Sequence, residues 1–147
     1  KVQIVGAGSC TIYADQAGNN NYSAASQASQ TLSVSKATAS VTLESLSATY
    51  DGSVKTVSAT TTPTGLTVNM TYGGSATAPS NAGKYEVIAT IDNSNYEGSA
   101  KDTLVIAKAS QSISFDAISS KTYSDADFDP AASASSAASP RSSCSTR

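Results

Sequence analysis

The sequence has no histidine, no tryptophan and only two phenylalanines, and 14% of its residues are charged. The absence of histidine excludes nucleophile–base pairs of the Ser-His and Cys-His kind, and it excludes imidazole as a metal ligand. A Ser-Lys pair would need a lysine buried beside a serine, and nothing in the sequence marks one. We therefore expect no catalytic residues and no enzyme activity.

Positive charge and long apolar runs are also scarce. The chain has 9 Lys and Arg against 11 Asp and Glu, and its isoelectric point is near 4.8. With no basic cluster to neutralise a phosphate backbone, no nucleic-acid partner is expected. No apolar stretch approaches the ~20 residues that span a bilayer, so no membrane insertion is expected either. The chain lacks a signal peptide and opens at Lys1, which is typical of a processed or excised internal piece.

Only two cysteines are present, Cys10 and Cys144. They do not form a pair with metal-ligand spacing, so they predict no metal site. Two cysteines in a secreted chain can form a disulfide, but their spacing alone leaves the pairing open.

Small hydroxyl and β-branched residues make up much of what is present, including 28 Ser and 17 Thr. Such residues combined with low charge favour half-exposed strands over helices. Disorder is typical of high net charge with few apolar residues. Here the net charge is −2 and 39% of the residues are hydrophobic, in short patterned runs. The composition predicts a folded, all-β chain.

An internal repeat organises the sequence. The segment 31–37, TLSVSKA, returns as 103–109, TLVIAKA, at a shift of 72 residues. Other matches follow at shifts of 72 to 75, and loop insertions produce small drifts of this size. These matches are Val41 with Ile113, Leu43 with Phe115, Leu46 with Ile118, Tyr50 with Tyr123, Ala7-Gly8 with Ala82-Gly83, Ile12 with Val87, and Asn21-Tyr22 with Asn95-Tyr96.

The repeat divides the chain into four parts. Residues 1–36 hold the C-terminal half of a preceding repeat, and residues 37–109 form a complete one. Residues 110–136 hold the N-terminal half of a following repeat, and residues 137–147 form an irregular tail without a large apolar residue, which cannot bury a strand face. The junctions around Lys36 and Lys108 contain no Gly or Pro, which favours short, stiff connections.

Within the complete repeat, apolar residues recur with a period of two, as in strands with one buried face. Short strands at roughly ten-residue spacing with turns between them predict an immunoglobulin-like β-sandwich. A β-grasp-like module is the alternative, because the pattern does not give the strand order. Tyr85 fits a tyrosine corner, whose hydroxyl bonds to nearby backbone. The expected strands lie at 41–43, 54–62, 66–72, 85–91 and 104–106.

The same alternation predicts which side chains are buried. A register slip of one residue would put the whole set on the wrong face. We expect burial of Leu66, Val68, Tyr85, Val87, Leu104 and Ile106, and exposure of Thr67, Asn69, Lys84 and Glu86.

Four ordered motifs carry a family resemblance: ATYDG at 48–52, TPTGL at 62–66, SNAGKY at 80–85 and NYEG at 95–98. The unit resembles the YDG/MBG-type modules that recur in tandem in large bacterial surface proteins and adhesins. The flanks resemble a sister immunoglobulin-like repeat from the same arrays. In that sister repeat a cysteine at the position of Cys10 pairs with one on an earlier strand, which this chain does not contain. The resemblance implies surface display and a structural or adhesive role.

Three alternate carboxylates, Asp125, Asp127 and Asp129, are candidate metal ligands, because calcium takes six to eight oxygen ligands. The Gly and the distal Glu of a calcium loop are missing. We therefore favour a solvated turn with Phe128 tucked inward, and we expect no cofactor, with calcium as the alternative. Asp51-Gly52 is likewise interpreted as a turn.

Two further groups of residues have a functional and a structural interpretation. Lys36 and Lys108 invite comparison with domains that cross-link a Lys to an Asn, but a cross-link needs a buried Lys, Asn and carboxylate together. Exposed charges at the junctions are expected instead. Four tyrosines could form a carbohydrate platform, although repeat-equivalent aromatics are more often core and corner residues. They are Tyr22, Tyr50, Tyr85 and Tyr96.

The sequence thus predicts a non-catalytic stalk or spacer segment of a secreted or surface-anchored bacterial adhesin, placed at the cell surface or outside the cell. Its expected partners are the neighbouring repeats of the same protein. One alternative is an adhesive module that binds a host glycan or protein. The other is a filament subunit, in which the half-repeats at 1–36 and 110–136 of different chains complete each other through exposed strand edges.

Overall fold

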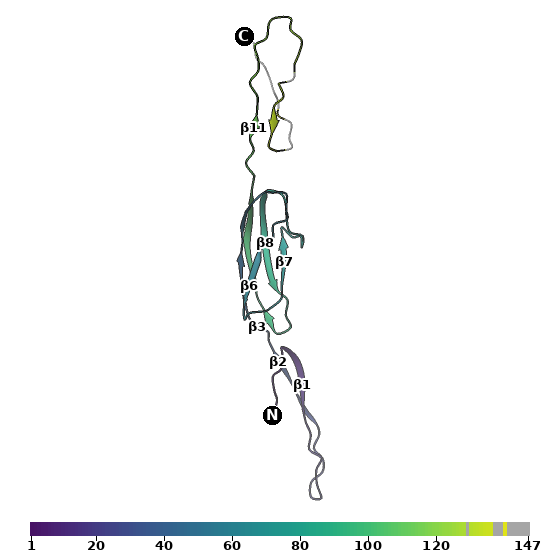
Figure 1. Ribbon diagram of the computed structural model, residues 1–147. Coiled ribbons are helices and arrows are strands. Elements are labelled where there is room, and N and C mark those ends of the chain that lie inside the picture. Colours follow the sequence, from purple (N-terminus) through teal and green to yellow (C-terminus); the bar gives the residue numbers. More distant parts are fainter. Residues whose placement is uncertain (129, 137–139, 141–147) are drawn as a thin grey trace. The chain divides into compact units, whose positions relative to one another are not determined.

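A computed structural model describes residues 1–128, 130–136 and 140 (Figure 1). It comprises two compact units, Lys1–Ala107 and Lys108–Arg147, and each is described by itself. The first unit begins with a hairpin of two antiparallel strands, β1 (Gly8–Ala14) and β2 (Ala28–Val34). The rest of that unit is the central module, which starts at Ala37.

The central module contains a mixed sheet of four strands in the order β5-β10-β8-β7. Its antiparallel part consists of β7 (Val68–Tyr72), β8 (Gly83–Ile91) and β10 (Ser99–Ala107). The short β5 (Ser47–Thr49) lies parallel to the end of β10. Two further pairs complete the module: antiparallel β4 (Ser40–Glu44) with β6 (Ser58–Thr62), and parallel β3 (Ala37–Thr38) with β9 (Tyr96–Glu97).

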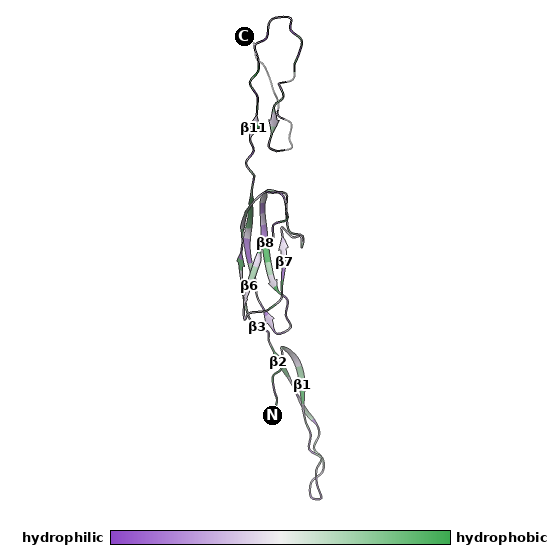
Figure 2. Cartoon of the chain, in the orientation of Figure 1, coloured by the Kyte–Doolittle hydropathy of each residue, from purple (hydrophilic) through white to green (hydrophobic). Residues whose placement is uncertain are grey.

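The core lies between the four-stranded sheet and the antiparallel pair β4–β6. Strand β4 contacts both β8 and β10, and Leu43 of β4 packs against the buried cluster. The hydrophobic part of β8 is green in Figure 2. Full burial of one such side chain contributes about 1.5–3 kcal/mol. The buried cluster consists of Val57, Tyr72, Val87, Leu104 and Ile106.

The predicted register is confirmed. Val87, Leu104 and Ile106 are buried, and their polar neighbours face solvent. The others of the predicted buried set, which lie nearer the rim, are half-buried: Leu66, Val68 and Tyr85. The predicted exposed set is exposed throughout: Thr67, Asn69, Lys84 and Glu86.

Two tyrosine hydroxyls tie the module together. The Tyr85 hydroxyl donates a hydrogen bond of 3.0 Å to the carbonyl of Asn81, four residues upstream, so the predicted tyrosine corner is confirmed. The Tyr72 hydroxyl accepts a buried hydrogen bond of 3.1 Å from the Val57 N–H. That bond satisfies a backbone donor which the β4–β6 ladder leaves unpaired.

Several expected strand boundaries were wrong, and β10, expected over 104–106, begins already at Ser99. The strand expected over 54–62 begins only at Ser58, and Val54 is 59% exposed in a loop. The expected strand over 66–72 begins at Val68. Strand β5 was not expected, because Ser47-Ala48-Thr49 has no large apolar residue to mark it.

In the described residues of the second unit there is one short antiparallel pair, β11 (Ile113–Ser114) with β12 (Ser133–Ala134). Ile113, Phe115 and Ile118 are 66%, 53% and 48% exposed. Except for Pro140, the predicted irregular tail lies outside the described residues. Throughout the described part of the chain the structure is strands and loops with no helix, so the all-β class is confirmed. The choice between immunoglobulin-like and β-grasp-like topology stays a prediction.

Candidate functional site: the junction between repeats

Asp125, one of the candidate metal ligands in the second unit, takes part in a turn. The N–H of Thr122 donates to Asp125 Oδ2 at 2.8 Å, and the Asp125 N–H donates to the carbonyl of Thr122 at 3.0 Å. Asp125 and Asp127 both line a shallow recess with Lys121, whose charge opposes that of the carboxylates. Asp129 lies outside the described residues.

The ring of Phe128 does not turn inward as expected. Its side chain is 48% exposed, and the Lys121 ammonium lies 4.9 Å from the ring centroid. Within the described ranges, no group of three or more His, Cys, Asp or Glu residues is placed to hold a metal ion. Calcium binding by Asp125 and Asp127 needs ligands that these ranges do not bring together, and the prediction of no cofactor stays a prediction.

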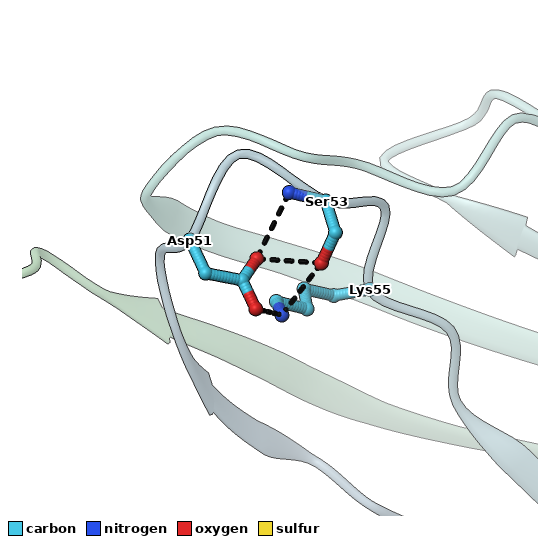
Figure 3. A network of polar contacts seen from close by, with 3 residues as sticks. All are labelled: Asp51, Ser53 and Lys55. Atoms are coloured by element: carbon cyan, nitrogen blue, oxygen red, sulfur yellow. Dashed lines mark hydrogen bonds and ion pairs between the residues drawn. The ribbon is translucent and has the colours of Figure 1, made fainter.

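The loop after β5 holds a compact polar network (Figure 3). Asp51 Oδ2 accepts from the Lys55 ammonium at 2.6 Å, and Asp51 Oδ1 accepts from the Ser53 N–H at 2.9 Å and from the Ser53 hydroxyl. The hydrogen bond from Lys55, followed by those from Ser53, holds the pKa of Asp51 well below its usual range. Gly52 has a φ of 82°, which favours glycine. The predicted turn at Asp51-Gly52 is confirmed.

The predicted exposure of the two junction lysines is confirmed, since Lys36 and Lys108 are both exposed. The Lys36 ammonium donates to a backbone carbonyl, that of Asn93, at 2.7 Å. The four tyrosines divide into two kinds. Tyr85 and Tyr96 are half-buried, whereas Tyr22 and Tyr50 are 75% and 41% exposed, so a core role was wrong for those two.

A pair of asparagines in the β8–β9 loop forms the junction between the N-terminal hairpin and the central module. Asn93 Oδ1 accepts from the N–H groups of Asn95 and Tyr96, at 2.8 and 3.1 Å, which closes an Asx turn. The turn presents the Asn95 side chain to the segment before β1. There Asn95 Oδ1 accepts from the Ala7 N–H at 2.9 Å.

Two further contacts fix this junction. The Asn95 carbonyl accepts from the Ala37 N–H at 2.8 Å, where the module begins. A side chain on Gly6 would place its Cβ 2.9 Å from Asn95 Oδ1, the end of a flexible side chain, so it would displace Asn95 from this contact. The motif NYEG begins at Asn95, but the sequence gave no signal for the Asx turn at Asn93 or for the long-range partner Ala7.

The same Asx turn occurs in the N-terminal hairpin. Asn19 Oδ1 accepts from the N–H groups of Asn21 and Tyr22, at 2.8 and 3.0 Å. Asn19 precedes Asn93 by 74 residues, within the range of shifts seen in the sequence. The repeat therefore includes the hydrogen bonds of this turn as well as the amino-acid sequence.

The strand register repeats too. In the hairpin, Gly8 lies opposite Val34 and Cys10 opposite Leu32. In the module, Gly83 lies opposite Ile106 and Tyr85 opposite Leu104, at shifts of 75 and 72 residues for the two strands. The hairpin β1–β2 is thus the counterpart of β8–β10. Cys10 is exposed and carries a free thiol, and Cys144 lies outside the described residues.

A complete module, preceded by the counterpart of its own closing strands, defines a tandem-repeat protein of the all-β class. Comparison with known families then identifies the repeat: residues 39–110 match the family model of the MBG domain. The resemblance to YDG/MBG-type modules is confirmed for the central module. MBG domains are repeat modules of surface proteins and are not a known enzyme family.

The match at 39–110 overlaps the predicted repeat at 37–109 almost completely. No curated protein and no solved structure matches the chain. In the part of the chain that the structure describes, no helix is both long and apolar enough to cross a membrane.

Proposed function

We propose that this chain is a stalk or spacer segment of a secreted or surface-anchored bacterial adhesin. The observation that carries the proposal is the repetition of strand register and Asx turn from one repeat to the next. A spacer has to supply only length, so it can be built by repeating one module and one kind of junction. This is possible because each repeat contacts only its neighbours.

The module suits a chain that is pulled from both ends. Its first strands include β5, and its last strand is β10, and these two lie parallel. A pull on the two ends that reaches β5 and β10 loads their hydrogen bonds along the strands, in shear, so that the bonds must break together. The bonds at this place include Val105 N–H to the Leu46 carbonyl, 2.9 Å, and Tyr50 N–H to the Ala107 carbonyl, 2.8 Å.

Display on a heterologous cell surface tests the proposal. The chain is placed between a membrane anchor and a small binding domain of known ligand, on cells that carry a thick polymer coat. We expect it to raise ligand capture as much as an unrelated rigid spacer of the same length does. The chain displayed without the binding domain should capture neither glycans nor host proteins.

The same cells distinguish the adhesive alternative. Specific capture of a glycan or a host protein by the chain alone would make it a binding module and overturn the spacer proposal. The exposed Tyr22 and Tyr50 are then the residues to substitute first, because aromatic faces bind sugars.

A further inference from the structure

The sequence contains one Asp-Gly pair, Asp51-Gly52, and the structure places it in an exposed loop of the central module. Aspartate followed by glycine is especially prone to form isoaspartate, because glycine has no Cβ to obstruct the ring closure that the reaction requires. The Asp51 side chain is 58% exposed, so burial does not protect it. This peptide bond is therefore chemically labile unless something else restrains the carboxyl group.

The reaction needs no partner other than water. The Gly52 backbone nitrogen attacks Asp51 Cγ and loses its proton, and one carboxyl oxygen leaves as water, which gives a five-membered succinimide. Water then opens the ring. Opening at Cγ restores the aspartate, whereas opening at the main-chain carbonyl leaves an isoaspartyl residue, whose main chain runs through Cβ and Cγ. The reactive form is the protonated carboxyl group, since an ionised one repels the nucleophile and has no hydroxyl to release.

The polar network around Asp51 opposes the ring closure. Asp51 Oδ1 accepts from the Ser53 N–H at 2.9 Å and from the Ser53 hydroxyl, and Oδ2 accepts from the Lys55 ammonium at 2.6 Å. Figure 3 shows both oxygens turned towards these two residues. The Lys55 side chain is only 17% exposed, and its ammonium also donates to Ser53 Oγ at 3.0 Å. An oxygen can therefore leave Asp51 only after several hydrogen bonds have broken.

The same contacts keep Asp51 in its unreactive form. The hydrogen bond from Lys55, followed by those from Ser53, holds the pKa of the Asp51 carboxyl well below its usual range. At neutral pH the protonated fraction falls about tenfold for each pH unit by which the pKa is lowered. The network thus restrains the carboxyl group and also depletes the form that reacts.

Isomerisation at this position would disturb the backbone contacts on both sides of the loop. Before it, the Tyr50 N–H donates to the Ala107 carbonyl at 2.8 Å, next to the pairing of β5 with β10. After it, the Lys55 N–H donates to the Pro79 carbonyl, also at 2.8 Å. An isoaspartyl residue adds one carbon to the main chain between these two fixed points, so protection of Asp51 preserves the geometry of the loop.

We propose that Asp51-Gly52 is a latent site of isoaspartate formation, and that Ser53 and Lys55 suppress the reaction by binding both oxygens of the Asp51 carboxylate. The modification is spontaneous and takes place within the chain. Its rate is set by the network, because the loop is open to water and the glycine offers no obstruction.

Two substitutions in the full chain test this proposal. Lys55→Gln removes the ammonium, and Ser53→Ala removes the hydroxyl while it keeps the backbone donor. Lys84→Gln is the matched control, since it makes the same change at an exposed lysine on β8. Tyr85→Phe is a second control, because it removes a hydrogen bond outside the loop and so weakens the module without touching the network.

The proteins are aged at neutral pH in buffer, and circular dichroism checks that each remains folded. Isoaspartate at residue 51 is measured over time by peptide mapping, in which the isomer elutes apart from the aspartyl peptide. The unaltered chain aged in denaturant gives the rate without the network. Asp51→Glu identifies the signal, because a glutamate does not readily close the corresponding six-membered ring.

We expect the folded, unaltered chain to isomerise at least roughly tenfold more slowly than the same chain in denaturant, as a lowered pKa of Asp51 requires. Lys55→Gln should recover most of that difference, and Ser53→Ala a smaller part of it. Lys84→Gln and Tyr85→Phe should isomerise at the rate of the unaltered chain.

Equal rates in the folded and the denatured chain would overturn the proposal, as would a Lys55→Gln variant that isomerises no faster than the unaltered chain. An equal acceleration in Tyr85→Phe and Lys55→Gln would also overturn it, because loss of stability would then be the cause. None of these results bears on the spacer proposal, which the cell-surface display tests separately.

Discussion

Short polar side chains determine the local structure of this protein by bonding to nearby backbone and to one another. Asn19 and Asn93 close the same turn in two repeats, and the Tyr85 hydroxyl closes a corner. The sequence allowed the corner and the Asp51-Gly52 turn to be predicted, because both depend on neighbours in the chain. It did not reveal that Lys55 completes the Asp51 network, because an Asp and a Lys four residues apart in a loop have no fixed geometry.

The Asp51 network predicts an acid-dependent change. The pKa of Asp51 is lower in the folded chain than the ordinary value of about 3.9. Its contribution to stability is therefore complete above that ordinary value and is lost as the pH falls through the folded value. NMR titration should find the Asp51 carboxylate still ionised at a pH where ordinary aspartates are protonated.

Ser53→Ala should raise the pKa of Asp51 towards its ordinary value, and Lys55→Gln should raise it further, because Lys55 makes the larger contribution. Ser80→Ala, in another loop, is the control and should leave the titration unchanged. An Asp51 that titrates normally in the unaltered chain would show that the network does not form in solution.

The tyrosine corner predicts a measurable loss of stability. Tyr85→Phe removes one hydrogen bond and leaves the ring in place, so the free energy of unfolding should fall by about 0.5–1.5 kcal/mol. Tyr50→Phe is the control, because the Tyr50 ring is partly exposed and its hydroxyl has no hydrogen-bond partner among the described residues. Denaturant unfolding of the full chain measures both, and equal effects of the two substitutions would contradict the assigned role.

At the scale of elements, the alternation of apolar and polar residues predicted the strands that have one buried face. It did not predict the strands that lack such a face. Strands β7 and β8 were predicted to within two residues, and β10 was predicted in its C-terminal part, because the apolar residues there face a core. Strand β5 depends on backbone pairing with β10 and carries no such mark. The segment before Ser58 was predicted to be part of a strand because of Val54. It instead forms the loop that holds the Asp51 network, and Val54 is exposed there.

Equivalent strands in the module and the hairpin should respond differently to the same substitution. Leu104→Ala should lower the free energy of unfolding of the module by about 2–5 kcal/mol, because Leu104 is fully buried. Leu32→Ala, at the equivalent position of β2, should leave the main unfolding transition unchanged, because Leu32 is only half-buried. A similar loss from both would mean that hairpin and module share one core.

The junction predicts a local effect on exchange. Asn95→Ala removes the acceptor of the Ala7 N–H, so the exchange of the Ala7 amide with solvent should become faster. Asn21→Ala is the matched control, since Asn21 occupies the equivalent position in the hairpin turn and does not contact Ala7. NMR hydrogen exchange measures this directly, and an unchanged Ala7 rate in Asn95→Ala would show that this contact does not hold the junction.

At the scale of the whole molecule, residues 39–110 match the MBG family model, the register of β1–β2 repeats that of β8–β10, and the register of β11–β12 repeats that of β4–β6. The internal repeat predicted this organisation, because residues that match at a nearly constant shift can be found without knowing the fold. It could not reveal that the two halves keep the register of the module, because register depends on pairing between distant residues. The central claim is that the complete repeat is one independent folding unit.

Unfolding of the segment 36–109 on its own tests that claim most directly, followed by circular dichroism against temperature and denaturant. The account predicts a single cooperative transition, with a denaturant midpoint close to that of the same module in the full chain, because the buried cluster lies wholly within the segment. A gradual transition without a folded baseline would contradict it, since the module would then depend on strands from its flanks.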